Sequence, residues 1–354
     1  MNLVETILRE NIEKQRSPSV QYRIFNKDGP IYKFHDGFAD IKHSIKANDK
    51  TTYHAFSVTK TFTALAILQL VEQGRLKLTD SVYMHLPNFP YPQNITVKQL
   101  LTHSAGIPSP LPLNWIHLAD VHESFNRDEF FTGTCKKYPK VKFGPNESYL
   151  YSNLGYVFLG LLIEKIADTT YEQFIEENIF RKIGLQQNDI GFTIANNREN
   201  AKGYHMRKSI SNIILGFLID KSKYMNQVEG KWIAFNDFYV NGPSYGGLIG
   251  TPDAFAKYLQ ELLKRNGSLL SEDSKKMLFT ENSTRAGKRT GMCLSWFTGK
   301  LNDKVYLTHA GGGGGFYCEI RIYPEREVGS VIMFNRTGMR DERFLDKLDR
   351  YFLG

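Results

Sequence analysis

The sequence predicts an α+β sandwich in which an antiparallel sheet is flanked by helices and carries a mostly helical insertion lobe. Strand-like runs stand near both ends of the chain, at 20–25 and 31–34, and again at 291–298, 304–309, 316–323 and 328–334. Helical patterns and loops fill the middle. Strands at both ends can pair into one sheet, so we expect residues 1–75 and 240–354 to form one discontinuous lobe and residues 76–239 a second.

Periodicity and end signals predict the elements of the first half. An amphipathic, charged helix is expected over Val4–Lys14, followed by two strands that Lys27-Asp28-Gly29 joins as a hairpin turn. An apolar helical run follows Ser57 and stops near Gly74, because glycine commonly ends a helix. Further helices are expected at 97–102, 154–168 and 171–183.

The last third opens with a clear helix start. Thr251 and Pro252 supply an N-cap and a first-turn proline for a helix that runs to Arg265. The four C-terminal strands come after it, and a final helix is expected over 341–352.

Composition is that of a soluble globular protein. The 354 residues are 41% hydrophobic and 13% aromatic, enough to bury a large core. No stretch reaches the ~18 apolar residues that a membrane span needs. Residues 1–16 lack the unbroken apolar core and the cleavage site of a secretion signal. We therefore expect a cytoplasmic location, or a secreted one if a leader was removed; the oligomeric state stays open.

Charge and cysteine content argue against two kinds of site. The net charge is +8, but the basic residues are scattered and their clusters are short, which favours a solvated surface over a nucleic-acid groove. The three cysteines, Cys135, Cys293 and Cys318, are odd in number and widely spaced. Neither a disulfide framework nor a zinc site is indicated, and we expect no metal and no cofactor.

Ser57-Val58-Thr59-Lys60 is the most informative stretch. It places a hydroxyl and an amine three residues apart at the head of a helix, on one face, so that the Lys60 amine can reach the Ser57 oxygen. A helix N-terminus also offers unpaired N–H groups to a developing oxyanion. A serine is a weak nucleophile until a neighbour takes its proton, and a partly buried lysine can do that. Alone, this short motif is weak.

Two further elements follow in a telling order. Tyr151-Ser152-Asn153 stands between a Gly/Pro turn and an apolar helical stretch, and His309-Ala310-Gly311 opens a run of five glycines in a strand-like context. With these elements, the chain resembles the serine β-lactamase-like and penicillin-binding-protein-like hydrolases. Within them it is similar to the branch of class C β-lactamases, D-alanyl-D-alanine carboxypeptidases, D-aminopeptidases and related carboxylesterases. Segments 95–107, 151–160 and 246–253 extend the resemblance over most of the chain from about residue 29 to 335.

The resemblance implies an active site between the lobes and a role for each motif. Ser57 would be the nucleophile that forms an acyl-enzyme, with Lys60 and Tyr151 moving the proton. Asn153 would hydrogen-bond the lysine and a substrate amide. Gly311 would leave the strand edge open beside the acyl group.

We further expect the backbone N–H of Gly312, by its position, to join that of Ser57 as an oxyanion donor. His103, in Leu-Leu-Thr-His-Ser, we expect to be structural, because the family that the chain resembles uses this segment to brace the helical lobe.

His309 departs from the pattern of the β-lactamases of this branch, which usually carry a lysine there to meet the substrate carboxylate. A histidine is mostly neutral near pH 7 and donates one directed hydrogen bond. The expected substrate is therefore a small ester or a D-amino-acid amide or peptide. A class C-type β-lactamase remains an alternative, as does a non-catalytic protein of the same fold that binds peptidoglycan fragments.

One rival motif belongs to a different fold. Gly242-Pro243-Ser244-Tyr245-Gly246 fits the nucleophile elbow of α/β-hydrolases, and His309 follows it. An elbow needs a helix directly after the serine, whereas this sequence delays the helix until Thr251. The chain also lacks the alternating β-α repeats of a parallel sheet.

Overall fold

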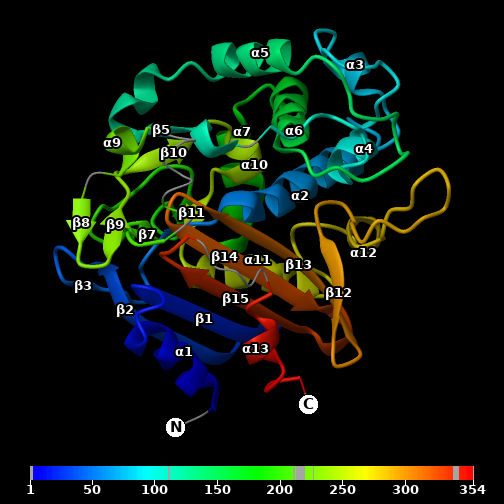
Figure 1. Cartoon of the computed structure of the whole chain (residues 1–354). Helices are drawn as coiled ribbons and strands as arrows, with labels where there is room; N and C mark the ends of the chain where they lie inside the picture. The colour runs from blue at the N-terminus through cyan, green and yellow to red at the C-terminus, as the bar shows by residue number, and fades with distance from the viewer. Residues whose placement is uncertain are drawn as a thin grey trace.

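A seven-stranded sheet built from both ends of the chain organises the computed structural model (Figure 1), which describes residues 3–110, 112–209, 212, 220–225, 227–337 and 343–353. In spatial order the strands are β12 (Phe297–Leu301), β13 (Lys304–Gly313), β14 (Phe316–Tyr323), β15 (Val328–Phe334), β1 (Ser19–Asn26), β2 (Pro30–Asp40) and β3 (Ile45–Lys46). All neighbours in this sheet are antiparallel. The predicted fold class is confirmed.

The two ends of the chain meet where β1 pairs with β15, in a register that sets Val20 opposite Phe334. Every residue of β14 and β15 is buried, because helices cover both faces of the sheet at this point. Side chains alternate between the faces with the period of two that a strand imposes. Val331 and Met333 join one hydrophobic cluster, and Ile332 and Phe334 join the other.

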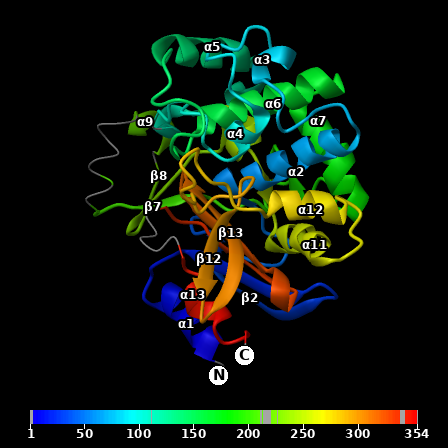
Figure 2. The same cartoon turned by 90° about the vertical axis from the view of Figure 1, so that its right-hand side faces the viewer.

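Different helices cover the two faces, as the views in Figures 1 and 2 show. α1 (Leu3–Glu13) and α13 (Asp346–Asp349) pack on one face through Val4, Leu8 and Leu348. α11 (Pro252–Leu263) and, beyond it, α2 (Thr59–Glu72) contribute to the large cluster on the other face. The Ser57-Val58-Thr59-Lys60 stretch, at the N-terminal end of α2, is carried on this second side.

The remaining helices are α3 (Val82–His85), α4 (Val97–Leu101), α5 (Arg127–Lys137), α6 (Asn153–Ala167), α7 (Tyr171–Ile175), α9 (Lys221–Tyr224), α10 (Pro243–Gly246) and α12 (Glu272–Leu278). Short sheets join β4 (Tyr53–His54), β11 (Ile249–Gly250) and β6 (Ile190–Gly191); β10 (Phe238–Val240) and β5 (Ile116–Leu118); and β7 (Tyr204–Met206), β9 (Trp232–Ala234) and β8 (Gln227–Glu229). Among the described residues, no helix has the length and apolar character needed to cross a membrane.

The other short helical segments of the described residues are 3₁₀ turns, which are tighter than an α-helix, and one π-helical segment, which is wider. They are η1 (Phe56–Val58), η2 (Pro112–Asn114), η3 (Ala119–Ser124), the π-helical η4 (Glu176–Phe180), η5 (Arg181–Ile183) and η6 (Pro324–Arg326). The helix predicted at 171–183 is therefore continuous in course but changes type twice after Ile175. Its end at Gly184, which adopts a left-handed φ of 69°, agrees with the prediction.

Two predicted elements differ in the structure. The strand expected at 291–298 starts only at Phe297, because residues before it form a buried turn in which Ser295 has a left-handed φ of 71°. The expected C-terminal helix shrinks to α13, with residues 341 and 342 outside the described residues. Conversely, β13 runs on through Gly313. The boundaries of the two lobes stay a prediction.

Candidate active site

Ser57 lies in η1, two residues before the start of α2. Twelve consecutive residues of α2, Thr59 to Leu70, are buried, so the helix is anchored in the core and its N-terminal end is a fixed point. Phe56, directly before the serine, has a left-handed φ of 47°, a conformation that costs a non-glycine residue energy and tends to cluster at functional sites. Ser57 itself stays partly exposed. The buried helix α2 thus holds the partly exposed Ser57 hydroxyl in a fixed place.

Lys60 reaches this hydroxyl from the first turn of α2. Its Nζ lies 3.0 Å from Ser57 Oγ and donates to the backbone oxygen of Tyr245 at 2.7 Å. The side chain is fully buried, and this loss of hydration lowers its pKa well below the ordinary value of a lysine. The rings of Tyr151, Tyr156 and Tyr245 stand 5.0 to 5.5 Å from Nζ. Burial therefore favours the neutral amine of Lys60. The faces of the three rings can stabilise the positive charge that the amine gains when it accepts a proton.

Tyr151 approaches the same hydroxyl from the turn before α6. Burial raises the pKa of its phenol, and hydrogen bonding to Ser57 lowers it by a smaller amount. Its hydroxyl also lies 3.5 Å from His309 Nε2, at the outer limit of a hydrogen bond. The phenol therefore stands in its protonated form between the serine and the histidine.

His309 lies on β13 and is buried. Its Nδ1 is 2.5 Å from the backbone oxygen of Ser295, so we assign the ring proton to Nδ1, which leaves the lone pair of Nε2 facing Tyr151. Burial, and then the charge of Lys60, lower the pKa of His309 to about 3. The imidazole is neutral, and its single N–H is already used. The N–H that we expected His309 to offer to a substrate is thus already bonded to Ser295.

Asn153 is the first residue of α6, and Ser152 caps that helix by accepting from the N–H of Gly155. The Asn153 side chain is buried, and its Oδ1 has no hydrogen-bond partner within the described residues. The bonds of Lys60 go to Ser57 and Tyr245 instead. Asn153 consequently brings an unsatisfied acceptor to the site, rather than the bond to the lysine that we expected.

Gly311 lets β13 pass directly against the serine. A Cβ on Gly311 would stand 2.1 Å from the backbone oxygen of Ala55 and 2.6 Å from the backbone nitrogen of Ser57, so no other residue fits. The pairing of β12 with β13 reaches only to Thr308, whereas β14 follows β13 up to Gly313. The far edge of β13 is therefore open beside Ser57, and Gly312 on it is exposed.

Sequence reasoning missed the backbone atoms that hold the site. The oxygens of Tyr245 and Ser295 fix Lys60 and His309, and no residue type is required for either role. The ring of Trp115 packs against that of Tyr245, with 5.6 Å between centroids. Ser244, the centre of the rival motif, lies inside α10, where its backbone oxygen accepts from Thr63 Oγ1 at 2.6 Å. The antiparallel sheet excludes the α/β-hydrolase alternative.

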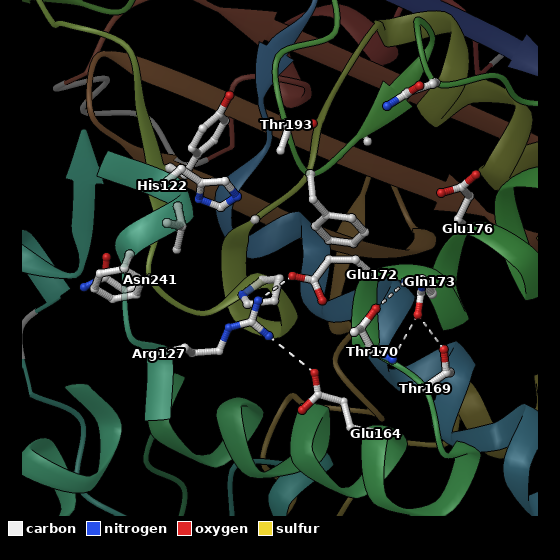
Figure 3. A pocket seen from close by; sticks show the side chains of 18 of the residues that line it. His122, Arg127, Glu164, Thr169, Thr170, Glu172, Gln173, Glu176, Thr193 and Asn241 are labelled. Carbon is white, nitrogen blue, oxygen red and sulfur yellow. Dashed lines mark hydrogen bonds and ion pairs between the residues drawn. The ribbon is translucent and has the colours of Figure 1, made fainter. Parts of the chain in front are cut away.

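A large cavity of about 1440 Å³ lies apart from these residues (Figure 3). Arg127 extends there between Glu164 and Glu172 and pairs with both. Burial raises the pKa of Glu164. Neither Ser57 nor Lys60 lines this cavity. We locate the candidate site by the Ser57–Lys60 geometry, since cavity size alone points elsewhere.

The family model described as Beta-lactamase matches residues 4–352, nearly the whole chain. The chain belongs to the Beta-lactamase family. This family shares the fold described above and consists in general of hydrolases that use a serine. Membership agrees with the resemblance inferred from the three motifs.

Two relatives are each about a quarter identical to this chain. Protein flp of Staphylococcus aureus (strain MW2) is 27% identical over 350 residues, which cover 94% of this chain and 62% of that protein. Penicillin-binding protein 4* of Bacillus subtilis (strain 168) is 26% identical over 316 residues, 86% of this chain and 65% of that protein. The chain thus spans less than two thirds of the length of these relatives.

Solved structures agree on the fold. The octameric penicillin-binding protein homologue from Pyrococcus abyssi superposes with a TM-score of 0.77 at 24% identity, covering 95% of this chain and 74% of that one. The D-amino acid amidase from Ochrobactrum anthropi SV3, complexed with L-phenylalanine, gives a TM-score of 0.75 at 18% identity, covering 99% of this chain and 96% of that one. At these identities the likeness concerns the fold.

Proposed function

We propose that this protein is a serine hydrolase that forms an acyl-enzyme on Ser57 and acts on small esters or on D-amino-acid amides and peptides. The observation that carries the proposal is the 3.0 Å contact between Ser57 Oγ and the fully buried Lys60 amine. A buried, neutral amine beside a partly exposed hydroxyl can accept its proton at neutral pH.

In the acylation step, Ser57 Oγ attacks the substrate carbonyl carbon and gives its proton to the Lys60–Tyr151 pair. The carbonyl oxygen gains the negative charge and is met by the backbone N–H groups of Ser57 and Gly312. The bond to the leaving alcohol or amine then breaks, and the pair returns the proton to that leaving group. Close passage of β13 at Gly311 supports this arrangement of donors.

In the deacylation step, the same pair takes a proton from water as the water attacks the acyl carbon. The ester bond to Ser57 breaks, and the proton returns to Ser57 Oγ. Asn153 Oδ1, a buried acceptor without a partner among the described residues, is suited to receive an amide N–H of the substrate. This favours substrates that carry an amide or amine near the reacting carbonyl.

The neutral state of His309 supports the choice of substrate class. A lysine at this place would offer a charge-assisted bond to a β-lactam carboxylate, whereas the single N–H of His309 is bound to Ser295. In addition, the Nε2 lone pair would repel a carboxylate. The site therefore suits substrates, such as esters and amides, that bring no carboxylate to His309.

A substrate panel tests the proposal, with Ser57→Ala as the matched control. The panel holds p-nitrophenyl esters, D-amino-acid amides, D-alanyl dipeptides and a chromogenic cephalosporin. We expect turnover of esters or D-amino-acid amides that is lost in Ser57→Ala, with the cephalosporin well behind. Cephalosporin hydrolysis above about 10⁴ M⁻¹s⁻¹ in kcat/KM would identify a β-lactamase instead. Binding of peptidoglycan fragments without Ser57-dependent turnover would identify a non-catalytic binding protein.

A further inference from the structure

His103 lies outside the motif residues, yet it holds Tyr151 from three directions. Its backbone oxygen accepts the N–H of Leu150 at 2.9 Å, and its ring Nδ1 accepts the N–H of Ser152 at 3.1 Å. These two N–H groups belong to the residues on either side of Tyr151. The imidazole also packs against the Tyr151 ring in a tilted arrangement, with 4.3 Å between centroids and 34° between planes.

The conformation of His103 is specialised for this contact. The residue is buried, follows α4, and has a left-handed φ of 54°, which a residue with a side chain rarely adopts. Because Nδ1 accepts from Ser152, the neutral ring carries its proton on Nε2. Nε2 has no partner among the described residues, so the only polar bond made by this buried ring is the one beside Tyr151. A ring needed merely as filling would be better replaced by an apolar side chain.

Protonation would break this arrangement, since a proton on Nδ1 would face the Ser152 N–H. Burial first, and then the nearby Lys60 and His309, lower the pKa of His103 well below its ordinary value, which keeps the ring neutral. Tyr151 therefore stands between two neutral imidazoles, with His103 against its ring and backbone and His309 at its hydroxyl.

We infer that His103 is a positioning residue that sets where the Tyr151 hydroxyl stands relative to Ser57, and that it acts on the reaction only through Tyr151. The inference rests on the proposed function of Tyr151 in proton transfer. Displacing a catalytic group by about 1 Å can cost roughly 10²-fold in rate. Removing the support should therefore lower kcat and leave KM nearly unchanged.

Two variants separate the side-chain hydrogen bond from the backbone conformation. Asparagine and glycine both tolerate the left-handed φ and both remove the ring, but only asparagine carries an acceptor, Oδ1, in the place of Nδ1. We expect His103→Gly to lower kcat between about 10- and 100-fold, and His103→Asn to stay within about 3-fold of the wild type. Equal losses in the two variants would overturn the inference.

A double-mutant cycle with Tyr151→Phe shows whether the effect passes through Tyr151. If it does, His103→Gly costs less than about 2-fold in the Tyr151→Phe background. Losses that multiply would mean that His103 supports the fold in general, and the inference would be wrong.

A readout without turnover keeps this test separate from that of the proposed function. The chain is labelled with 3-fluorotyrosine, and the ¹⁹F resonance of Tyr151 is assigned by its disappearance in Tyr151→Phe. We expect one sharp resonance in the wild type and in His103→Asn, and a broadened or split one in His103→Gly. An unchanged resonance in His103→Gly would contradict the inference, even in a chain that hydrolyses nothing.

Discussion

Ser57 and Ser244 both stand in sequence motifs of serine hydrolases, and the structure gives them opposite surroundings. Ser57 precedes the buried helix α2 and has the Lys60 amine 3.0 Å away. Ser244 is buried within α10, and its side chain packs on Gly160, where a Cβ would come within 2.5 Å of Ser244 Oγ. Among the described residues, no lysine or histidine hydrogen-bonds the Ser244 side chain. The comparison teaches that a neighbouring base, rather than a spacing of glycines, prepares a serine for attack.

The two regions are also connected. Thr63 of α2 donates to the backbone oxygen of Ser244, and the next residue, Tyr245, offers its backbone oxygen to Lys60. The rival motif thus supports the site with its backbone. Of its two glycines, Gly242 is the one that the packing requires, since a Cβ there would lie 2.7 Å from the Tyr245 ring.

The largest expected effect separates the two serines directly. Ser57→Ala should lower kcat for the best substrate by on the order of 10⁴-fold or more, because it removes the attacking atom. Ser244→Ala should stay within about 3-fold, because it keeps the backbone bonds of α10. Steady-state kinetics of the two purified variants, with matched thermal melts, measures this. Comparable losses of kcat in the two variants would show that the two serines do not differ in the way proposed.

The next effect tests the base. Lys60→Met keeps the buried apolar stem and removes the amine, and Tyr151→Phe keeps the ring and removes the hydroxyl. Each should cost about 10²- to 10⁴-fold in kcat, the usual range for acid–base groups. Since both serve one proton transfer, the double variant should be little worse than the worse single one. Losses that multiply would show two independent roles.

A smaller effect concerns substrate choice at His309. His309→Lys should raise kcat/KM for a cephalosporin, relative to that for a p-nitrophenyl ester, by about 10- to 100-fold, the value of a charge-assisted bond of roughly 1.5–3 kcal/mol. The ratio is the measurement, because a disturbed fold would lower both rates together. A ratio that does not rise would show that charge at this position does not divide the substrates.

The smallest effect separates the pH dependence of folding from that of catalysis. His54, three residues before Ser57, is buried against the Phe238 ring at 4.5 Å, and burial lowers its pKa to about 3. An unfolded histidine binds a proton near pH 6.5, so the folded state loses stability as pH falls from there toward 3.

Between pH 7 and pH 5 this loss should amount to about 2 kcal/mol for one such histidine. His54→Phe should remove it, which urea unfolding at both pH values measures. An equal pH dependence in the variant and the wild type would show that His54 is not the group responsible. Activity per folded molecule should keep its pH profile in this variant, because His54 has no part in the proposed chemistry.

Much of this arrangement follows from the sequence. The motifs of Ser57, Tyr151 and His309 lie far apart along the chain, and the structure brings them together around one hydroxyl, as the resemblance implied. Each motif can be recognised in the sequence because its proposed role requires a particular type of side chain. The sheet was predictable for a different reason, since β14 and β15 are mostly apolar runs of strand length.

What the sequence did not reveal depends on backbone atoms and on buried turns. The oxygens of Tyr245 and Ser295 place Lys60 and His309, and any residue type carries such an oxygen. Residues 291–296 look like part of a strand because they are mostly apolar and lead into Phe297, but the left-handed Ser295 turns the chain there. The bond of His309 to Ser295, which removes its one donor from the site, arises from that same turn.

The central claim is that Ser57 is the nucleophile, and covalent trapping tests it most directly. The wild type, Ser57→Ala and Ser244→Ala are treated with a fluorophosphonate and with penicillin, and the adduct is located by peptide mass spectrometry. The account predicts one adduct on Ser57 in the wild type and in Ser244→Ala, and none in Ser57→Ala. An adduct that persists in Ser57→Ala and disappears in Ser244→Ala would contradict it.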